Sequence, residues 1–201
     1  MSRTASYDQG RLADILRRQH QTIGRDQAFS CGLTPAAVQH RIRPGGPWRR
    51  LLPGVYVALT GPVAAEQREM AALIHAGPRS VLTGLAAARR HGFAAPEVAP
   101  VDVLVPPQVR RQSTGFVRVQ QSTRMPADAF VAGEVRYVRP ERAVADAARG
   151  LTVGAGCAGA NGAGRAAALV LNRLAGHGAG AGTTPWVGAV PGGIRGGAGG
   201  G

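Results

Sequence analysis

Ten residues near the amino end combine a helix-start signal with hydrogen-bonding side chains at helical spacing. They are Thr-Pro-Ala-Ala-Val-Gln-His-Arg-Ile-Arg, residues 34–43. Thr34 suits the N-cap, and Pro35 suits the first turn because its missing N–H would be unpaired there in any case. Val38 and Ile42, four residues apart, predict a buried seam. The opposite face then carries side chains that suit the DNA major groove, namely Ala36, Gln39, His40 and Arg43.

A helix in the major groove needs supporting elements, and the preceding residues supply them. Apolar residues at helical spacing predict an amphipathic helix over residues 11–19, and residues 25–29 predict a short second helix. Gly32 would make the tight turn into the third helix. Together these segments predict a helix-turn-helix.

The residues that follow predict a hairpin, or wing. The Pro-Gly-Gly-Pro sequence at 44–47 ends the helix, and two short apolar runs flank Pro53-Gly54. Arg49 and Arg50 on the first run would both meet DNA phosphates. We expect Trp48 to pack beneath the hairpin. The predicted DNA-binding residues are therefore Thr34, Ala36, Gln39, His40, Arg43, Arg49 and Arg50.

A plainer interpretation of this region remains open. Any small three-helix module can turn Val38 and Ile42 inward, and charged outer faces are usually only solvated. The coincidence of cap, turn, helix and arginine-bearing hairpin within residues 8–58 favours DNA binding.

Composition agrees with a polyanionic partner. The 201 residues include 24 basic and 11 acidic side chains, a net charge of +13, and every basic one is arginine. Arginine binds phosphate and guanine bidentately, but a GC-rich genome also replaces lysine with arginine, so the net charge is the stronger indication. Without a leader-like or membrane-length apolar segment, we expect a soluble, cytoplasmic protein that does not contact membranes. Cys31 and Cys157 lack partners at zinc spacing, so we expect neither metal nor cofactor.

A second unit begins after the Leu-Thr-Gly-Pro sequence at residues 59–62. Its expected order of helix, helix, three strands and helix is typical of a small α+β domain, here over residues 62–150. The expected segments are helices over 63–75, over 83–91 and from Pro140, and strands over 101–105, 116–119 and 135–138.

Spacing also predicts which way side chains of this unit face. Glu69 should point outward from its helix, and Val144 and Ala148 should point inward from the last one. His75 and His91 lie where cations favour the end of a helix.

Charged residues of the second unit predict an ion pair on its last helix and, separately, a candidate basic face. Arg142 and Asp146, four residues apart, predict an ion pair on a helix surface. Further arginines would form a basic face if they gather on one side of the domain, and would otherwise be scattered solvated charges. They are Arg110, Arg111, Arg118 and Arg124, with Arg136 and Arg139 as further members.

Beyond residue 150 the composition changes. Seventeen of the 30 glycines lie there, and no acidic residue does. Apart from one short helical segment over 166–174, such a tail cannot bury enough apolar surface to offset its chain entropy. Out-of-frame translation of a GC-rich gene would give the same composition. The expected fold is therefore α+β, with an N-terminal winged helix-turn-helix over 8–58, an α+β domain over 62–150 and a disordered Gly-rich tail over 151–201.

Several motifs between residues 11 and 150 carry a family resemblance. They are Leu-Ala-Asp-Ile-Leu at 12–16, Cys-Gly-Leu at 31–33, Arg-Arg-Leu-Leu-Pro-Gly-Val-Tyr at 49–56, Val-Leu-Thr-Gly at 81–84, Arg-His-Gly at 90–92, Val-Asp-Val-Leu-Val-Pro at 101–106 and Pro-Glu-Arg-Ala-Val-Ala-Asp at 140–146. In this order they resemble actinobacterial proteins with an AbiEi-type antitoxin N-terminal domain, the regulators of type IV toxin–antitoxin systems.

The resemblance implies a winged helix-turn-helix that binds inverted repeats in its own promoter and represses it, with a second domain required for antitoxicity. It implies a toxin similar to a nucleotidyltransferase, opposed without a stable protein complex. Some relatives carry a restriction-nuclease-like domain where this chain has its glycine-rich tail. The alternative is therefore a protein-interaction module or a truncated relative of a nuclease-like protein.

Enzymatic motifs find little support in the residues. A restriction-type nuclease needs clustered carboxylates and usually a lysine, whereas this chain has no lysine and no acid after Asp146. The Gly-x-Gly-x-x-Gly pattern at 154–159 follows no expected strand and precedes no carboxylate, so it is a chance match to a dinucleotide fingerprint. We therefore expect no catalytic residue.

Overall fold

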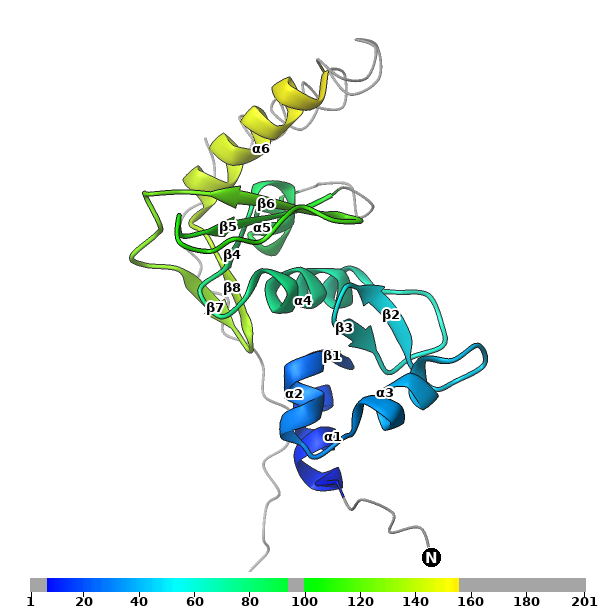
Figure 1. The fold of residues 1–201 in the computed structure, drawn as a ribbon. Coiled ribbons are helices and arrows are strands. Elements are labelled where there is room, and N and C mark those ends of the chain that lie inside the picture. The colour runs from blue at the N-terminus through cyan, green and yellow to red at the C-terminus, as the bar shows by residue number, and fades with distance from the viewer. Residues whose placement is uncertain (1–6, 94–99, 156–201) are drawn as a thin grey trace, which may run out of the picture.

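The computed structural model describes residues 7–93 and 100–155 (Figure 1). This described part is α+β, with six helices and two sheets. The first sheet and its helices are built from α1 (Gln9–Arg18), β1 (Thr22–Gly24), α2 (Arg25–Ser30), α3 (Pro35–Ile42), β2 (Arg49–Leu52) and β3 (Val55–Val57). The rest is α4 (Ala65–Ala76), β4 (Val81–Thr83), α5 (Gly84–Arg90), β5 (Val101–Val105), β6 (Val117–Gln121), β7 (Phe130–Ala132), β8 (Val135–Tyr137) and α6 (Pro140–Ala155).

Local signals explain where the first three helices begin. The Asp8 carboxylate accepts the Arg11 N–H at 2.8 Å and caps α1, and the Thr34 hydroxyl accepts the Ala37 N–H at 3.1 Å and caps α3. Gly32 makes the turn between α2 and α3 at a φ of 85°, a conformation that favours glycine. The helices expected over 11–19, 25–29 and 34–43 are thus confirmed with small shifts of their ends.

The first sheet has three antiparallel strands in the order β1-β3-β2. Its β2–β3 hairpin, which the sequence predicts, turns at Gly54 with a φ of 74°. Strand β1 is an element that the sequence analysis missed. Its three residues are too few to show a periodicity, and it forms because Thr22 pairs with Val57 on the far side of β3.

The second sheet has five strands in the order β6-β5-β4-β8-β7. Strand β4 pairs antiparallel with β5 and parallel with β8, so the sheet is mixed. The three strands expected in this unit are confirmed as β5, β6 and β8. Strands β4 and β7, which have three residues each, were not predicted from the sequence.

Helix α4 packs against both sheets and lies between them in Figure 1. One apolar cluster joins Leu52 and Val55 of the hairpin to Met70 of α4 and to Val103 of β5. This cluster therefore extends across the boundary expected at residues 59–62, because the hairpin contributes to it. Because α4 is covered on several sides, Glu69 is buried instead of facing outward, and Arg89 and Arg90 bind its oxygens at 2.6 and 2.7 Å.

Helix α6 corrects two expectations. Its buried face carries Ala143, Asp146 and Ala147, while Val144 and Ala148 are only half-buried, so the helix is rotated relative to the predicted seam. It also continues to Ala155, past the limit expected at residue 150. The other expectations for the tail, including the helical segment over 166–174, concern residues outside the described part.

In residues 7–93 and 100–155, no helix combines the length and the apolar composition that crossing a membrane requires.

Candidate nucleic-acid interface

The polar face of α3 is open to solvent. Ala36, Gln39, His40 and Arg43 are exposed, whereas Val38 is 2% exposed and Ile42 is half-buried. The division of this helix into two faces is therefore confirmed. Thr34 is exposed as well, but its hydroxyl oxygen is engaged in the N-cap.

The buried side of α3 rests on a small apolar cluster. Val38 packs with Leu12 and Ile15 of α1, with Leu33 and with Trp48. Trp48 is buried and stacks on Tyr56 with ring centroids 6.2 Å apart, which confirms its predicted place beneath the hairpin. This packing fixes the position of the exposed face of α3 relative to the β2–β3 hairpin.

Arg41, which is also part of α3, turns inward. Its guanidinium lies over the rings of Tyr7 and Trp48, at 5.0 and 5.6 Å from their centroids, and donates to the Ala37 carbonyl oxygen at 3.1 Å. Cation–π contacts of this kind stabilise the helix on its support. Of the two arginines at the end of α3, Arg41 is therefore held against the protein, and Arg43, the C-cap residue, extends into solvent.

The two arginines of β2 have different surroundings. Arg49 is half-buried and donates to the carbonyl oxygens of Leu59, at 3.1 Å, and of Gly61. Arg50 is exposed, and within the described ranges no side-chain hydrogen bond or ion pair holds it. Successive side chains of a strand point to opposite faces. The expectation that both would contact phosphate equally is therefore not supported, because Arg49 anchors the segment that leads to α4.

A shallow groove brings α3 and the hairpin together. It has a volume of about 260 Å³ and is lined by Gln39 of α3, Arg50 of β2 and Arg25 of α2, with Phe29 and Tyr56 among its apolar walls. Two of the predicted binding residues thus share one concavity. His40 and Arg43 lie on the same helix but are not part of this lining.

Arg25 is a residue of this groove that the sequence analysis missed. Its N–H donates to the Gly54 carbonyl oxygen at 2.7 Å, and a Cβ at Gly54 would lie 3.3 Å from its guanidinium. The side chain therefore lies across the hairpin turn. No local signal could have revealed this, because Arg25 and Gly54 are distant in the sequence and meet only through the pairing of β1 with β3.

The arginines proposed as a basic face have separate roles. Arg110, Arg111 and Arg124 are exposed. Arg118 is not a free cation, because its Nε and Nη2 lie 2.8 and 2.9 Å from the oxygens of Asp102. Arg124 lies next to α6, where Arg142 donates to its carbonyl oxygen at 3.5 Å. Arg118 therefore cannot contribute an unpaired cation to a basic face, whereas Arg110, Arg111 and Arg124 remain exposed.

Two buried carboxylates form the most chemically unusual cluster of the second unit. The Asp146 side chain is 1% exposed and accepts hydrogen bonds from Thr83 Oγ1 at 2.5 Å, from Arg142 Nε at 2.7 Å and from Arg149. The expected ion pair between Arg142 and Asp146 is therefore confirmed, but its expected place on the helix surface is wrong. Asp146 is buried because α6 turns it toward β4, and its hydrogen bond with Thr83 of β4 joins the helix to the sheet.

Asp102 is the second carboxylate of this cluster. It accepts from Arg118 and from Gln120 Nε2, the latter at 3.2 Å. Burial raises the pKa of Asp102 above its usual value of 3.8, against the lowering effect of Arg118. Nearby Asp146 raises this pKa further. Partners already occupy the oxygens of both carboxylates, and the described residues contain no group of three or more His, Cys, Asp or Glu that could hold a metal ion.

The histidines expected at helix ends make tertiary contacts. His91 Nε2 donates to the Val138 carbonyl oxygen at 2.8 Å, and its ring packs edge-on against Phe130 and Tyr137. His75 Nε2 donates to the Gln112 carbonyl oxygen at 3.1 Å. Both rings therefore hold a neighbouring segment in place.

Comparison of the chain with known proteins finds no matching protein-family model and no curated protein that matches.

Proposed function

We propose that this protein is a transcriptional regulator that binds double-stranded DNA through a winged helix-turn-helix. The observation that carries the proposal is the exposed polar face of α3 beside a groove that Gln39 shares with Arg50 of the hairpin. In this fold type the third helix enters the major groove and the hairpin lies over the adjacent backbone. The order α1-β1-α2-α3-β2-β3 supports this assignment.

The charge of this region supports a DNA partner. Residues 7–58 contain eight arginines and three aspartates. Asp14 pairs with Arg17 and Arg18 of its own helix α1, at 2.5 and 3.0 Å. The arginines next to α3 and the hairpin, Arg25, Arg43 and Arg50, form no ion pair within the described part of the chain. A surface that carries unpaired guanidinium groups attracts phosphate.

The biological role that we propose follows from the resemblance to AbiEi-type antitoxins. The protein would bind inverted repeats in its own promoter and repress it as the antitoxin of a type IV system. Its toxin would be a nucleotidyltransferase-like enzyme with which it forms no stable complex. Growth measurements test this role, since co-expression of the chain should restore growth to cells that express a nucleotidyltransferase-like toxin encoded next to its gene.

The DNA-binding proposal is tested with fluorescent duplexes. The full chain should bind a duplex from the region upstream of its gene more tightly than a shuffled duplex of equal composition. Replacing Gln39 or His40 by alanine should reduce that preference by roughly 1–3 kcal/mol, the typical worth of a base contact. Absence of binding to any duplex at 50 mM salt would refute the proposal.

A protein-interaction module is the second candidate. It is favoured by the exposed edge strand β7, where Phe130 and Val131 are 45% and 66% exposed. An apolar edge strand can pair with another chain. If this were the main function, Val131→Asp would abolish the biological activity while leaving DNA affinity unchanged.

A further inference from the structure

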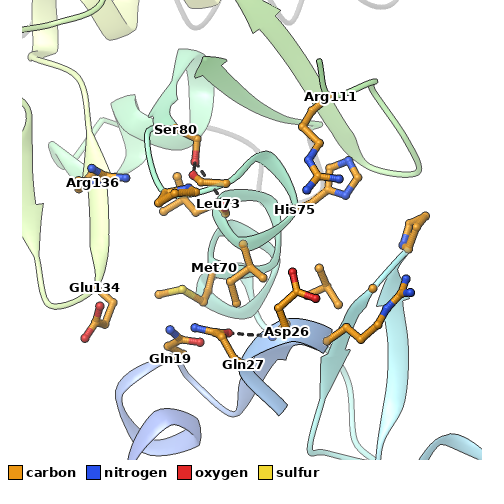
Figure 2. A pocket seen from close by; sticks show the side chains of 18 of the residues that line it. Gln19, Asp26, Gln27, Met70, Leu73, His75, Ser80, Arg111, Glu134 and Arg136 are labelled. Carbon is orange, nitrogen blue, oxygen red and sulfur yellow. Dashed lines mark hydrogen bonds between the residues drawn. The ribbon is translucent and has the colours of Figure 1, made fainter. Parts of the chain in front are cut away.

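A larger cleft lies between the two sheets. It is next to the groove that Gln39 and Arg50 line, which we call the DNA-facing groove. Its volume is about 770 Å³, within the range of roughly 300–1,000 Å³ that is usual for small-molecule sites. Helix α4 forms its floor with Met70, Leu73 and Ile74, and the hairpin turn and the β7–β8 turn form two of its sides (Figure 2). The cleft therefore combines an apolar floor with walls from both halves of the described chain.

The rim of this cleft carries an excess of positive charge. Arg25, Arg111 and Arg136 line it, and none of them forms an ion pair with a carboxylate in residues 7–93 and 100–155. His75 lines the cleft as well, and its ring hydrogen-bonds to the carbonyl oxygen of Gln112, the residue after Arg111. Two carboxylates also line the cleft, but Glu134 already pairs with Arg18 at 3.2 Å, which leaves Asp26.

We propose that this cleft binds a small organic anion with an apolar body, and that such a ligand controls DNA binding. The apolar part would lie on Leu73 and Ile74, and the anionic group would be held by Arg111. A buried apolar contact together with a charge-assisted hydrogen bond is the usual basis of recognition for such ligands. A purely inorganic anion would leave the floor of α4 unused.

Arg25 connects the cleft with the DNA-facing groove, because it lines both. An anion in the cleft attracts this guanidinium and lowers the positive charge available to a DNA phosphate on the other side. Ligand and DNA therefore compete for Arg25, and each weakens the binding of the other by the same factor. This control step depends on the proposed DNA-binding function, whereas ligand binding to the cleft does not.

Ligand binding is tested on the full chain without DNA. The probe is 8-anilinonaphthalene-1-sulfonate, and the neutral comparison is N-phenyl-1-naphthylamine, which lacks the sulfonate. Titration calorimetry should show one saturable sulfonate site per chain. Arg111→Gln should weaken that binding about tenfold and leave the neutral probe unaffected, whereas Arg110→Gln, the matched control outside the lining, should change neither.

Three results would overturn the ligand site. They are the absence of saturable binding of the sulfonate, equal affinity in the two arginine variants, and displacement of the probe by inorganic phosphate at the same concentration as by an aromatic carboxylate such as naphthoate. The last result would mean that the apolar floor contributes nothing.

The control step is tested by repeating the duplex titration with the cleft saturated by the probe. DNA affinity should fall by about fivefold or more, the lower end of typical coupling between sites. In Arg25→Gln the probe should leave the remaining DNA affinity unchanged. An unchanged affinity of the unsubstituted chain would overturn the control step alone, while a chain that binds the probe but no DNA would instead refute the proposed function.

Discussion

Replacing Arg50 by glutamine removes an exposed cation from the hairpin and breaks no side-chain hydrogen bond or ion pair of the described residues. The neighbouring Arg49→Gln is its matched control, since Arg49 donates to the carbonyl oxygens of Leu59 and Gly61. If α3 and the hairpin engage DNA, Arg50 contacts phosphate and Arg49 does not. The two variants should therefore differ in kind, with Arg50→Gln changing electrostatic binding and Arg49→Gln changing stability.

The size of the first effect follows from counterion release. Each phosphate contact contributes about 0.9 to the slope of log K against log salt concentration. Loss of Arg50 should reduce that slope by about 0.9 per bound chain, so the ratio of unsubstituted to variant affinity should shrink by about 3.5-fold between 50 and 200 mM salt. The loss should be the same on operator and shuffled duplexes.

The Arg49 control should behave differently in both measurements. Losing two charge-assisted hydrogen bonds at a half-buried site should lower the free energy of unfolding by about 1–3 kcal/mol. The salt slope of the variant that remains folded should equal that of the unsubstituted chain. Anisotropy titrations at four salt concentrations and urea unfolding provide the two quantities. Equal slopes for Arg50→Gln and the unsubstituted chain would refute the assignment of the hairpin to the phosphate backbone.

Three further predictions concern stability. Asp146→Ala should lower the free energy of unfolding in urea by about 3 kcal/mol, near the lower end for a broken buried pair, because Arg142 and Arg149 can regain water; a loss below 1 kcal/mol would contradict the role of Asp146 in holding α6. Burial raises the pKa of Asp102, so its stabilising contribution is complete below pH 3.8 and is lost as the pH rises through its folded-state pKa. The stability of the unsubstituted chain relative to Asp102→Asn should therefore fall over that pH window, and a rise would contradict the prediction. In urea unfolding, Thr34→Ala should lower the free energy of unfolding by about 0.5–2 kcal/mol through the lost cap of α3, and Thr34→Ser should restore most of it.

Local signals in the sequence were sufficient for the elements that carry the candidate interface. A cap at Thr34, a first-turn proline and apolar residues four apart specify α3 and its faces without reference to the rest of the chain. The strands β1, β4 and β7 escaped prediction because each is defined by the strands with which it pairs, which the sequence does not show. The sequence also could not separate exposed arginines from paired ones. Spacing does not distinguish Arg50, which lies in solvent, from Arg118, which pairs with a buried carboxylate.

The ion pairs show in which part of the protein the unpaired positive charge lies. Three buried carboxylates of the larger sheet and its helices pair with five arginines and offset part of their charge; these arginines are Arg89, Arg90, Arg118, Arg142 and Arg149. Near α3, Arg25 and Arg50 line a groove whose described lining contains no carboxylate. The net charge of +13 therefore overstates the unpaired positive charge near the larger sheet. It also hides the difference between that region and the groove beside α3. Because α4 packs on both sheets in one apolar cluster, the two regions of different charge are connected through the hairpin and this helix.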